Sequence, residues 1–310
     1  MKQLYHVCIT CHSETLFRDD QDIRNITNIL ALVAFSCEIE IWVDAEMATH
    51  LHLIVFGEPD KVGSFAGRLK MRIAKYNRGR YGGAGPLFDP VTFVLRLEGQ
   101  NHILAAISYV LRNGMHHAAS ATPFGYPNCT VNELFRTELG KPPVKKQIVS
   151  RAEIAACLPR CSVFPDHYAM AADGTFLRST FEELCRVELC YRTPRAFLFQ
   201  MNRLSSEEWE KEQRGDDSTE EPVTLSKMEP QSDPKSLAIL LANEKGFNYR
   251  ADRKSDMQVC QLIDGSYLPK YRKSSVYQLD KRQRLHLAET LSREHFLPRA
   301  QLYRCLAIKE

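Results

Sequence analysis

Residues 37–57, CEIEIWVDAEMATHLHLIVFG, contain two short runs in which apolar and polar side chains alternate. Alternation with a period of two is typical of strands that bury one face. The runs cover residues 37–43 and 49–57, and the DAEM between them, residues 44–47, is expected to connect them as a hairpin. This stretch therefore predicts two adjacent antiparallel strands.

The segments around this hairpin extend it to an α+β pattern. They predict a strand at 5–11, a helix at 22–35, a helix at 62–76, a strand at 87–97 and a helix at 101–114. This order favours an α+β domain over residues 1–130, built as a ferredoxin-like antiparallel sheet covered by helices.

Glycine and proline mark two expected interruptions in this domain. NRGRYGGAGP, residues 77–86, is expected to be irregular after the second helix. Gly114 stands where a glycine cap would close the last helix.

The rest of the chain divides by composition into three parts. Residues 131–205 have a mainly helical pattern and form an accessory segment, and residues 206–235 are acidic, polar and proline-bearing, which predicts a flexible linker. Residues 236–310 are expected to form a basic helical domain. Its end is compatible with a helix-turn-helix whose last helix starts at Pro298, or with a plain amphipathic pair.

Composition sets the broad class of protein. The chain has 310 residues, a formal net charge of +3 and ten cysteines. Its longest apolar stretch, residues 26–43, is interrupted by Asn28, Glu38 and Glu40, so no bilayer span is expected. The first residues lack the apolar core of a signal peptide, which favours a reducing, cytoplasmic location. Cys8 and Cys11 fall on opposite faces of a strand, which disfavours a shared zinc ion.

His50 and His52 are the first candidates for chemistry. Side chains two residues apart on a strand point to the same face, so the two imidazoles project together. Such a pair can bind one metal ion, but it also occurs as two unrelated polar residues on an exposed sheet face. A third partner is needed to decide between these interpretations.

The helix expected at 101–114 offers such partners. Tyr109 and Asn113 are four residues apart and therefore neighbours on one helix face, away from the apolar stripe. Without further support, a tyrosine at the edge of the core and an asparagine near a helix end would be ordinary structural residues.

Positive charge is concentrated between Lys61 and Arg80, where no acidic residue after Asp60 interrupts the basic side chains. A cluster of this kind can hold phosphates, and tyrosines within it can stack on unpaired bases. A solvated helix face is the alternative. The candidate DNA-binding residues are Arg68, Lys70, Arg72, Lys75, Tyr76, Arg78, Arg80 and Tyr81.

HLHLIV (50–55) followed by YVLRNG (109–114) resembles the HUH single-tyrosine transposases of the IS200 type, in particular their REP-associated branch. That family pairs a His-hydrophobic-His motif with Tyr-xxx-Asn/Gln. YHVCITCHSETLF near the start and GPLFDPVTFVLR before the tyrosine helix are also similar to it. The resemblance covers about residues 1–125.

The resemblance implies a role for each matching residue. Tyr109 would be the nucleophile, and His50 and His52 would bind Mg²⁺ or Mn²⁺ with Asn113 as a further ligand. The activity implied is cleavage and rejoining of single-stranded hairpin or repeat DNA through a 5′-phosphotyrosine, by a monomer or homodimer near the bacterial nucleoid.

Two other functions compete with this one. A histidine-triad nucleotide hydrolase would require a third histidine where Ile54 stands, which disfavours it. A non-catalytic or domesticated DNA-binding protein that keeps a transposase fold and acts through its basic tail is the stronger rival. A covalent protein–DNA adduct distinguishes the two.

Overall fold

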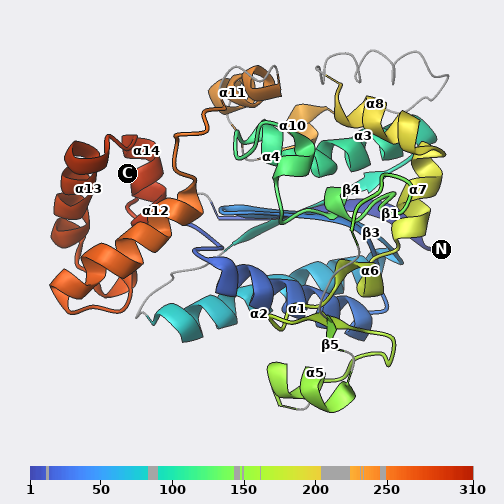
Figure 1. The fold of residues 1–310 in the computed structure, drawn as a ribbon, viewed down its shortest axis with the longest axis horizontal. Coiled ribbons are helices and arrows are strands. Elements are labelled where there is room, and N and C mark those ends of the chain that lie inside the picture. Colours follow the sequence, from blue (N-terminus) through green and yellow to red (C-terminus); the bar gives the residue numbers. More distant parts are fainter. Residues whose placement is uncertain are drawn as a thin grey trace.

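A four-stranded antiparallel sheet lies at the centre of the computed structural model (Figure 1). The structure describes residues 1–11, 14–82, 90–142, 147–148, 150–160, 162–203, 224–230, 232, 234–244 and 249–309. The first elements alternate in the order β1 (Gln3–Thr10), α1 (Asp20–Ser36), β2 (Glu40–Met47), β3 (His50–Gly57), α2 (Pro59–Tyr81) and β4 (Val91–Leu97). The strand order across the sheet is β2-β3-β1-β4. The α+β class and the antiparallel sheet are thus confirmed.

Helices cover both faces of the sheet (Figure 1). On one face, α1 and α2 pack on the side chains of odd-numbered β3 residues such as Leu51 and Leu53. On the other face, α3 (Gln100–Leu111) packs on Ile54 and on β2. The two-residue period of β3 therefore sends its apolar odd positions to one core and its histidines toward α3.

The β2–β3 hairpin corrects one sequence prediction. DAEM is not the connection, because Asp44–Met47 pair with His50–Leu53 as the end of β2. The chain turns at Ala48 and Thr49 instead. Asp44 and Glu46 are tolerated inside the sheet because Arg178 forms ion pairs with both carboxylates, at 2.7 and 2.9 Å.

Two glycine-based predictions were also wrong. Helix α2 continues through NRGRY to Tyr81, and only Gly82 ends it, with a positive φ of 63°; residues 83–86 lie outside the described residues. Gly114 does not cap a helix but lies within α4 (Asn113–His116), where a Cβ would come within 2.4 Å of Tyr126 Cβ. Close packing on Tyr126, and not a cap, explains the glycine.

Shorter elements follow the sheet domain. Between residues 123 and 201 lie two 3₁₀ turns, Pro123–Gly125 and Thr130–Asn132, then β5 (Gln147–Ile148), α5 (Arg151–Cys157), β6 (Met170–Ala171), α6 (Arg178–Phe181), α7 (Leu184–Tyr191) and α8 (Pro194–Met201). They are followed by α10 (Leu225–Met228) and α11 (Pro234–Glu244). Helices α8, α10 and α11 lie on the α3 side of the sheet (Figure 1).

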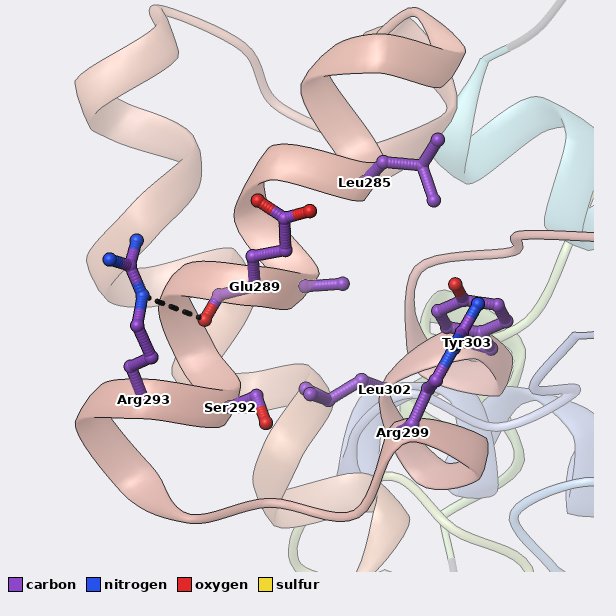
Figure 2. A pocket seen from close by; sticks show the side chains of 8 residues that line it. Leu285, Glu289, Ser292, Arg293, Arg299, Leu302 and Tyr303 are labelled. Carbon is purple, nitrogen blue, oxygen red and sulfur yellow. Dashed lines mark hydrogen bonds between the residues drawn. The ribbon is translucent and has the colours of Figure 1, made fainter.

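The C-terminal tail is helical, as predicted. It consists of α12 (Asp256–Leu262), a π-helical turn (Ile263–Tyr267), two 3₁₀ turns (Leu268–Tyr271 and Val276–Gln278), α13 (Lys281–His295) and α14 (Arg299–Cys305). These elements share a core that includes Ala74 and Tyr81 of α2. A cavity of about 530 Å³ opens between α13 and α14, with Leu285 and Leu302 among its lining and Arg293 and Arg299 beside them (Figure 2).

None of the helices in the described part of the chain combines the length and the apolar character needed to cross a membrane.

Candidate functional site

The site lies between the sheet and α3. β3 projects His50 and His52 from the same face, with ring centroids 4.8 Å apart. Thr49 Oγ1 lies 3.0 Å from His50 Nδ1, and Asn113 Oδ1 lies 3.2 Å from His50 Nε2. His50 therefore has a polar partner at each of its two ring nitrogens, which fixes the orientation of the ring.

Tyr109 reaches the histidine pair from the last turn of α3. Its ring centroid is 5.8 Å from that of His52, and its side chain is almost fully buried, with 3% of the residue exposed. The four residues singled out in the sequence, His50, His52, Tyr109 and Asn113, therefore meet in space. The helix break at Arg112, between α3 and α4, still leaves Asn113 facing His50.

Glu229 is a fifth member that the sequence analysis missed. Its Oε1 lies 2.9 Å from His52 Nε2 and accepts a hydrogen bond from the Tyr109 hydroxyl at 2.6 Å. The same oxygen is 3.5 Å from His117 Nε2. One carboxylate oxygen thus touches the proposed nucleophile and one of the two histidines of β3.

The segment that carries Glu229 was predicted to belong to the flexible linker. Residues 206–223 lie outside the described residues, but Leu225–Met228 form α10, whose first turn is capped by Thr224. Leu225 and Met228 are buried in the same core as α3. A capping threonine followed by two apolar residues at helical spacing was the available signal, and the acidic composition masked it.

Further histidines surround the pair. His6 of β1 places its Nε2 2.8 Å from His52 Nδ1. The rings of His117 and His50 are 4.4 Å apart, and those of His116 and Tyr109 are 4.6 Å apart. Imidazole rings from three elements therefore form the wall of the site.

Burial favours the neutral form of two histidines of this site, His50 and His6. It lowers the pKa of His50 well below the ordinary value, and the neighbouring His117 and His52 lower the pKa further. Burial also lowers the pKa of His6. For Glu229, burial acts to raise the pKa, but the adjacent histidines, His52 above all, hold the pKa well below the usual range. At neutral pH His50 and His6 are therefore neutral imidazoles, and Glu229 is a carboxylate.

This donor set fits a divalent metal ion. One donor atom each from His50, His52 and Glu229 lie within 4.8 Å of one another, and all three residues are buried. Two imidazoles and one carboxylate are a common metal-binding set, and imidazole favours transition metals over Mg²⁺. The amide oxygen of Asn113 already points at His50 and could complete the set.

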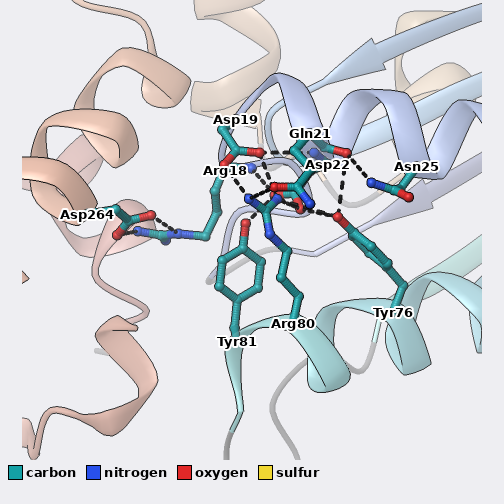
Figure 3. A network of polar contacts seen from close by, with 9 residues as sticks. All are labelled: Arg18, Asp19, Gln21, Asp22, Asn25, Tyr76, Arg80, Tyr81 and Asp264. Carbon is teal, nitrogen blue, oxygen red and sulfur yellow. Dashed lines mark hydrogen bonds and ion pairs between the residues drawn. The ribbon is translucent and has the colours of Figure 1, made fainter. Parts of the chain in front are cut away.

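The basic cluster of α2 lies on the opposite face of the sheet (Figure 1). Figure 3 shows that part of it is engaged internally: Arg80 pairs with Asp19 and Asp22, and the hydroxyls of Tyr76 and Tyr81 both donate to Asp22. Tyr81 is also buried, so it has no free face for a base. Arg68, Arg72, Lys75 and Arg78 are exposed, and Lys70 is partly exposed.

No protein-family model and no curated protein matches the chain. Among solved structures, it is similar to a REP-associated tyrosine transposase bound to a REP hairpin, with 14% identity and a TM-score of 0.37, over 46% of this chain and 82% of that one. Similarity at this level leaves the function to be decided by the chemistry of the site.

Proposed function

We propose that this chain is a metal-dependent enzyme that cuts and rejoins single-stranded DNA through Tyr109, as a tyrosine transposase does. The observation that carries the proposal is the 2.6 Å hydrogen bond from the Tyr109 hydroxyl to Glu229, which also contacts His52 in the metal-type cluster. A phenol that lies beside two histidines and a carboxylate is an arrangement suited to phosphodiester chemistry.

The residues divide into binding and reacting groups. His50, His52 and Glu229, with Asn113 beside them, would hold the ion, and the donor set favours Mn²⁺ over Mg²⁺. When bound, such an ion polarises the scissile phosphate. The remaining chemistry falls to Tyr109, the one nucleophilic side chain that donates a hydrogen bond to Glu229 among the contacts described.

The reaction is a transesterification. Tyr109 Oη forms a bond to phosphorus and its proton passes to Glu229. The bond from phosphorus to the 3′ oxygen breaks, and Glu229 passes the proton on to that oxygen, which leaves a 3′-OH and a 5′-phosphotyrosine. The phosphodiester energy is kept, so a 3′-OH of a second strand reverses the step and joins the DNA without ATP.

DNA cannot reach Tyr109 without a local rearrangement. Tyr109 is 3% exposed and Glu229 is 8% exposed. We expect DNA binding to open the site beside Tyr109 while Glu229, which directly follows α10, keeps its contacts to the tyrosine hydroxyl and to His52.

The sheet topology and the exposed cations extend this proposal. The βαββαβ order with strand order β2-β3-β1-β4 supports a ferredoxin-like sheet of the HUH nuclease type. The exposed cations of α2 would hold phosphates of a hairpin at a distance from the reacting strand, and their exposure supports this role.

The test is a covalent-adduct assay. The full chain is incubated with a library of labelled single-stranded hairpins and Mn²⁺, and adducts are resolved on denaturing gels. We expect a DNA-linked band that Tyr109→Phe removes, by at least about a thousandfold. Tyr191→Phe is the matched control, because Tyr191 is also buried and bonds to Ser108, the residue next to Tyr109. An adduct that survives Tyr109→Phe contradicts the assignment.

A second candidate function is DNA binding without catalysis. It is favoured by the C-terminal helices, where Lys281, Arg282, Arg293 and Arg299 are exposed and Phe296–Pro298 form a three-residue turn between α13 and α14. Hairpin binding that persists with no adduct on any hairpin would favour this function over the enzyme.

A further inference from the structure

His6 is a buried histidine that the proposed reaction leaves without a role. It lies on β1, which pairs with β3 so that Cys8 stands opposite His52. His6 and Cys8 are two residues apart and share one face of the sheet, which brings the His6 ring diagonally against that of His52. The residue is 1% exposed, and the two ring planes differ by 20°.

The contact between these rings is a hydrogen bond with a direction. His6 Nε2 and His52 Nδ1 are 2.8 Å apart, so one nitrogen carries a hydrogen and the other accepts it. The direction is set at the far side of His52, where Nε2 lies 2.9 Å from Glu229 Oε1. A carboxylate only accepts, so Nε2 of His52 carries a hydrogen there. In the tautomer that has its single hydrogen on Nε2, Nδ1 accepts from His6.

Metal binding requires the reverse direction. To offer its Nε2 lone pair to an ion, His52 must carry its hydrogen on Nδ1 instead, and Nδ1 then donates to His6 Nε2. A backbone carbonyl or a carboxylate in place of His6 could only accept a hydrogen bond, so it would suit only the tautomer of His52 that carries its hydrogen on Nδ1. A second imidazole suits both, because the same nitrogen donates in one tautomer and accepts in the other.

We infer that His6 is a positioning residue that lets His52 alternate between donating a hydrogen bond to Glu229 and ligating a metal ion, with neither ring changing place. The inference rests on the metal centre of the proposed function. In the change the hydrogen of His6 Nε2 passes to His52 Nδ1, His52 Nε2 gives up its hydrogen to water, and His6 Nδ1 takes one up from water. Each ring therefore carries one hydrogen before and after, and the net charge of the pair stays the same. The pair is therefore set up for reversible metal binding in a site that water barely reaches.

The first measurement is the affinity of the full-length protein for Mn²⁺ alone, without DNA, from the electron paramagnetic resonance signal of free Mn²⁺. Loss of an outer hydrogen-bond partner of a ligating histidine typically weakens metal binding about 10- to 100-fold, and we expect this for His6→Phe. His6→Gln, whose amide can donate or accept, should recover part of the loss.

The control is Cys8→Ala, which changes packing directly opposite His52 and keeps the His6 contact. It should bind Mn²⁺ within about threefold of the unmodified chain. Thermal unfolding of each variant separates weaker metal binding from loss of the fold.

The second measurement uses the unmodified protein and does not depend on any variant folding. Ring ¹⁵N resonances of His52 should show hydrogen on Nε2 without metal and on Nδ1 after Zn²⁺, a diamagnetic probe, is added. Nε2–H that persists with Zn²⁺ bound, or Mn²⁺ affinity of a folded His6→Phe within about threefold of the original, would overturn the role of His6 alone. Failure of the unmodified protein to bind either ion would overturn the metal centre and this inference together.

Discussion

Two buried tyrosine–carboxylate pairs in this molecule have the same hydrogen-bond distance, but different kinds of side chain surround their carboxylates. The Tyr109 hydroxyl donates to Glu229 at 2.6 Å, and the Tyr81 hydroxyl donates to Asp22 at 2.6 Å. Around Glu229 stand imidazole rings, whereas Asp22 faces the guanidinium of Arg80 and the backbone N–H of Arg18 (Figure 3). In the Asp22 network the guanidinium of Arg80 compensates the charge of the carboxylate. In the Glu229 cluster the partners are imidazoles, whose nitrogen lone pairs can bind a ligand.

The difference shows how a functional cluster can be told from a structural one. Guanidinium groups have no lone pair to offer and stay charged, so a carboxylate beside them is tied into an ion pair. Neutral imidazoles and a carboxylate can all turn toward a cation. The composition of the polar cluster, more than its burial, favours the α3 side of the sheet as the side of the proposed reaction.

The largest expected effect concerns Arg18, which joins the Asp22 network to the C-terminal helices. Its buried side chain pairs with Asp264 at 2.8 Å and donates to the carbonyl of Cys305 at 2.8 Å. Arg18→Ala removes a large side chain that is 1% exposed and leaves the carbonyl of Cys305 without this donor, so it should lower the free energy of unfolding by about 3–5 kcal/mol. Urea denaturation measures the change.

Arg24→Ala is the control for Arg18, since Arg24 makes an exposed bond to the carbonyl of Asp173 and should cost under about 1 kcal/mol. If the two variants lowered the free energy of unfolding by similar amounts, the Arg18–Asp264 pair would not stabilise the fold. The contrast between a stabilising network and a ligand-binding cluster would then lose its first member.

The next effect concerns Glu229. Glu229→Gln keeps an oxygen that can accept from Tyr109 but removes the negative charge, so affinity for Mn²⁺ should fall about 10- to 100-fold, or about 1.4–2.8 kcal/mol. Glu188→Gln is the control, because Glu188 accepts a backbone hydrogen bond from Phe135, outside the cluster. Titration calorimetry of both variants decides the matter, and unchanged affinity in Glu229→Gln would exclude Glu229 as a ligand.

The sequence predicted those parts of the site that depend on local periodicity. A strand has a period of two, so His50 and His52 had to share a face, and four residues in a helix bring Tyr109 next to Asn113. The hairpin was predicted with its turn four residues too early, because Asp44 and Glu46 are polar in the sequence and only Arg178, far along the chain, makes them acceptable inside a strand.

Glu229 could not be predicted by the same means. Its bond to Tyr109 spans 120 residues, and the acidic surroundings favoured a linker. For a related reason the sequence could not show that part of the basic cluster of α2 is engaged internally. It shows Arg80 and Tyr81, but not that Asp19 and Asp22 at the start of α1 meet them. Ion pairs between segments far apart in the sequence cannot be read from composition. They decide which charged side chains remain free to bind a ligand.

The last comparison sets the two tyrosines side by side in the metal-free protein, and the smallest cost is expected at Tyr109. Tyr81→Phe removes a donor from Asp22, whose side chain is 0% exposed and cannot recruit water, so the cost should be about 1.5–3 kcal/mol. Glu229 has an 11% exposed side chain, and water can replace the lost hydroxyl in Tyr109→Phe, which limits the cost to about 0.5–1 kcal/mol. Urea denaturation of both variants side by side gives the difference. A larger cost at Tyr109 than at Tyr81 would mean that the Glu229 cluster is the structural one, and that the tyrosine beside the histidines is there to hold α10 in place.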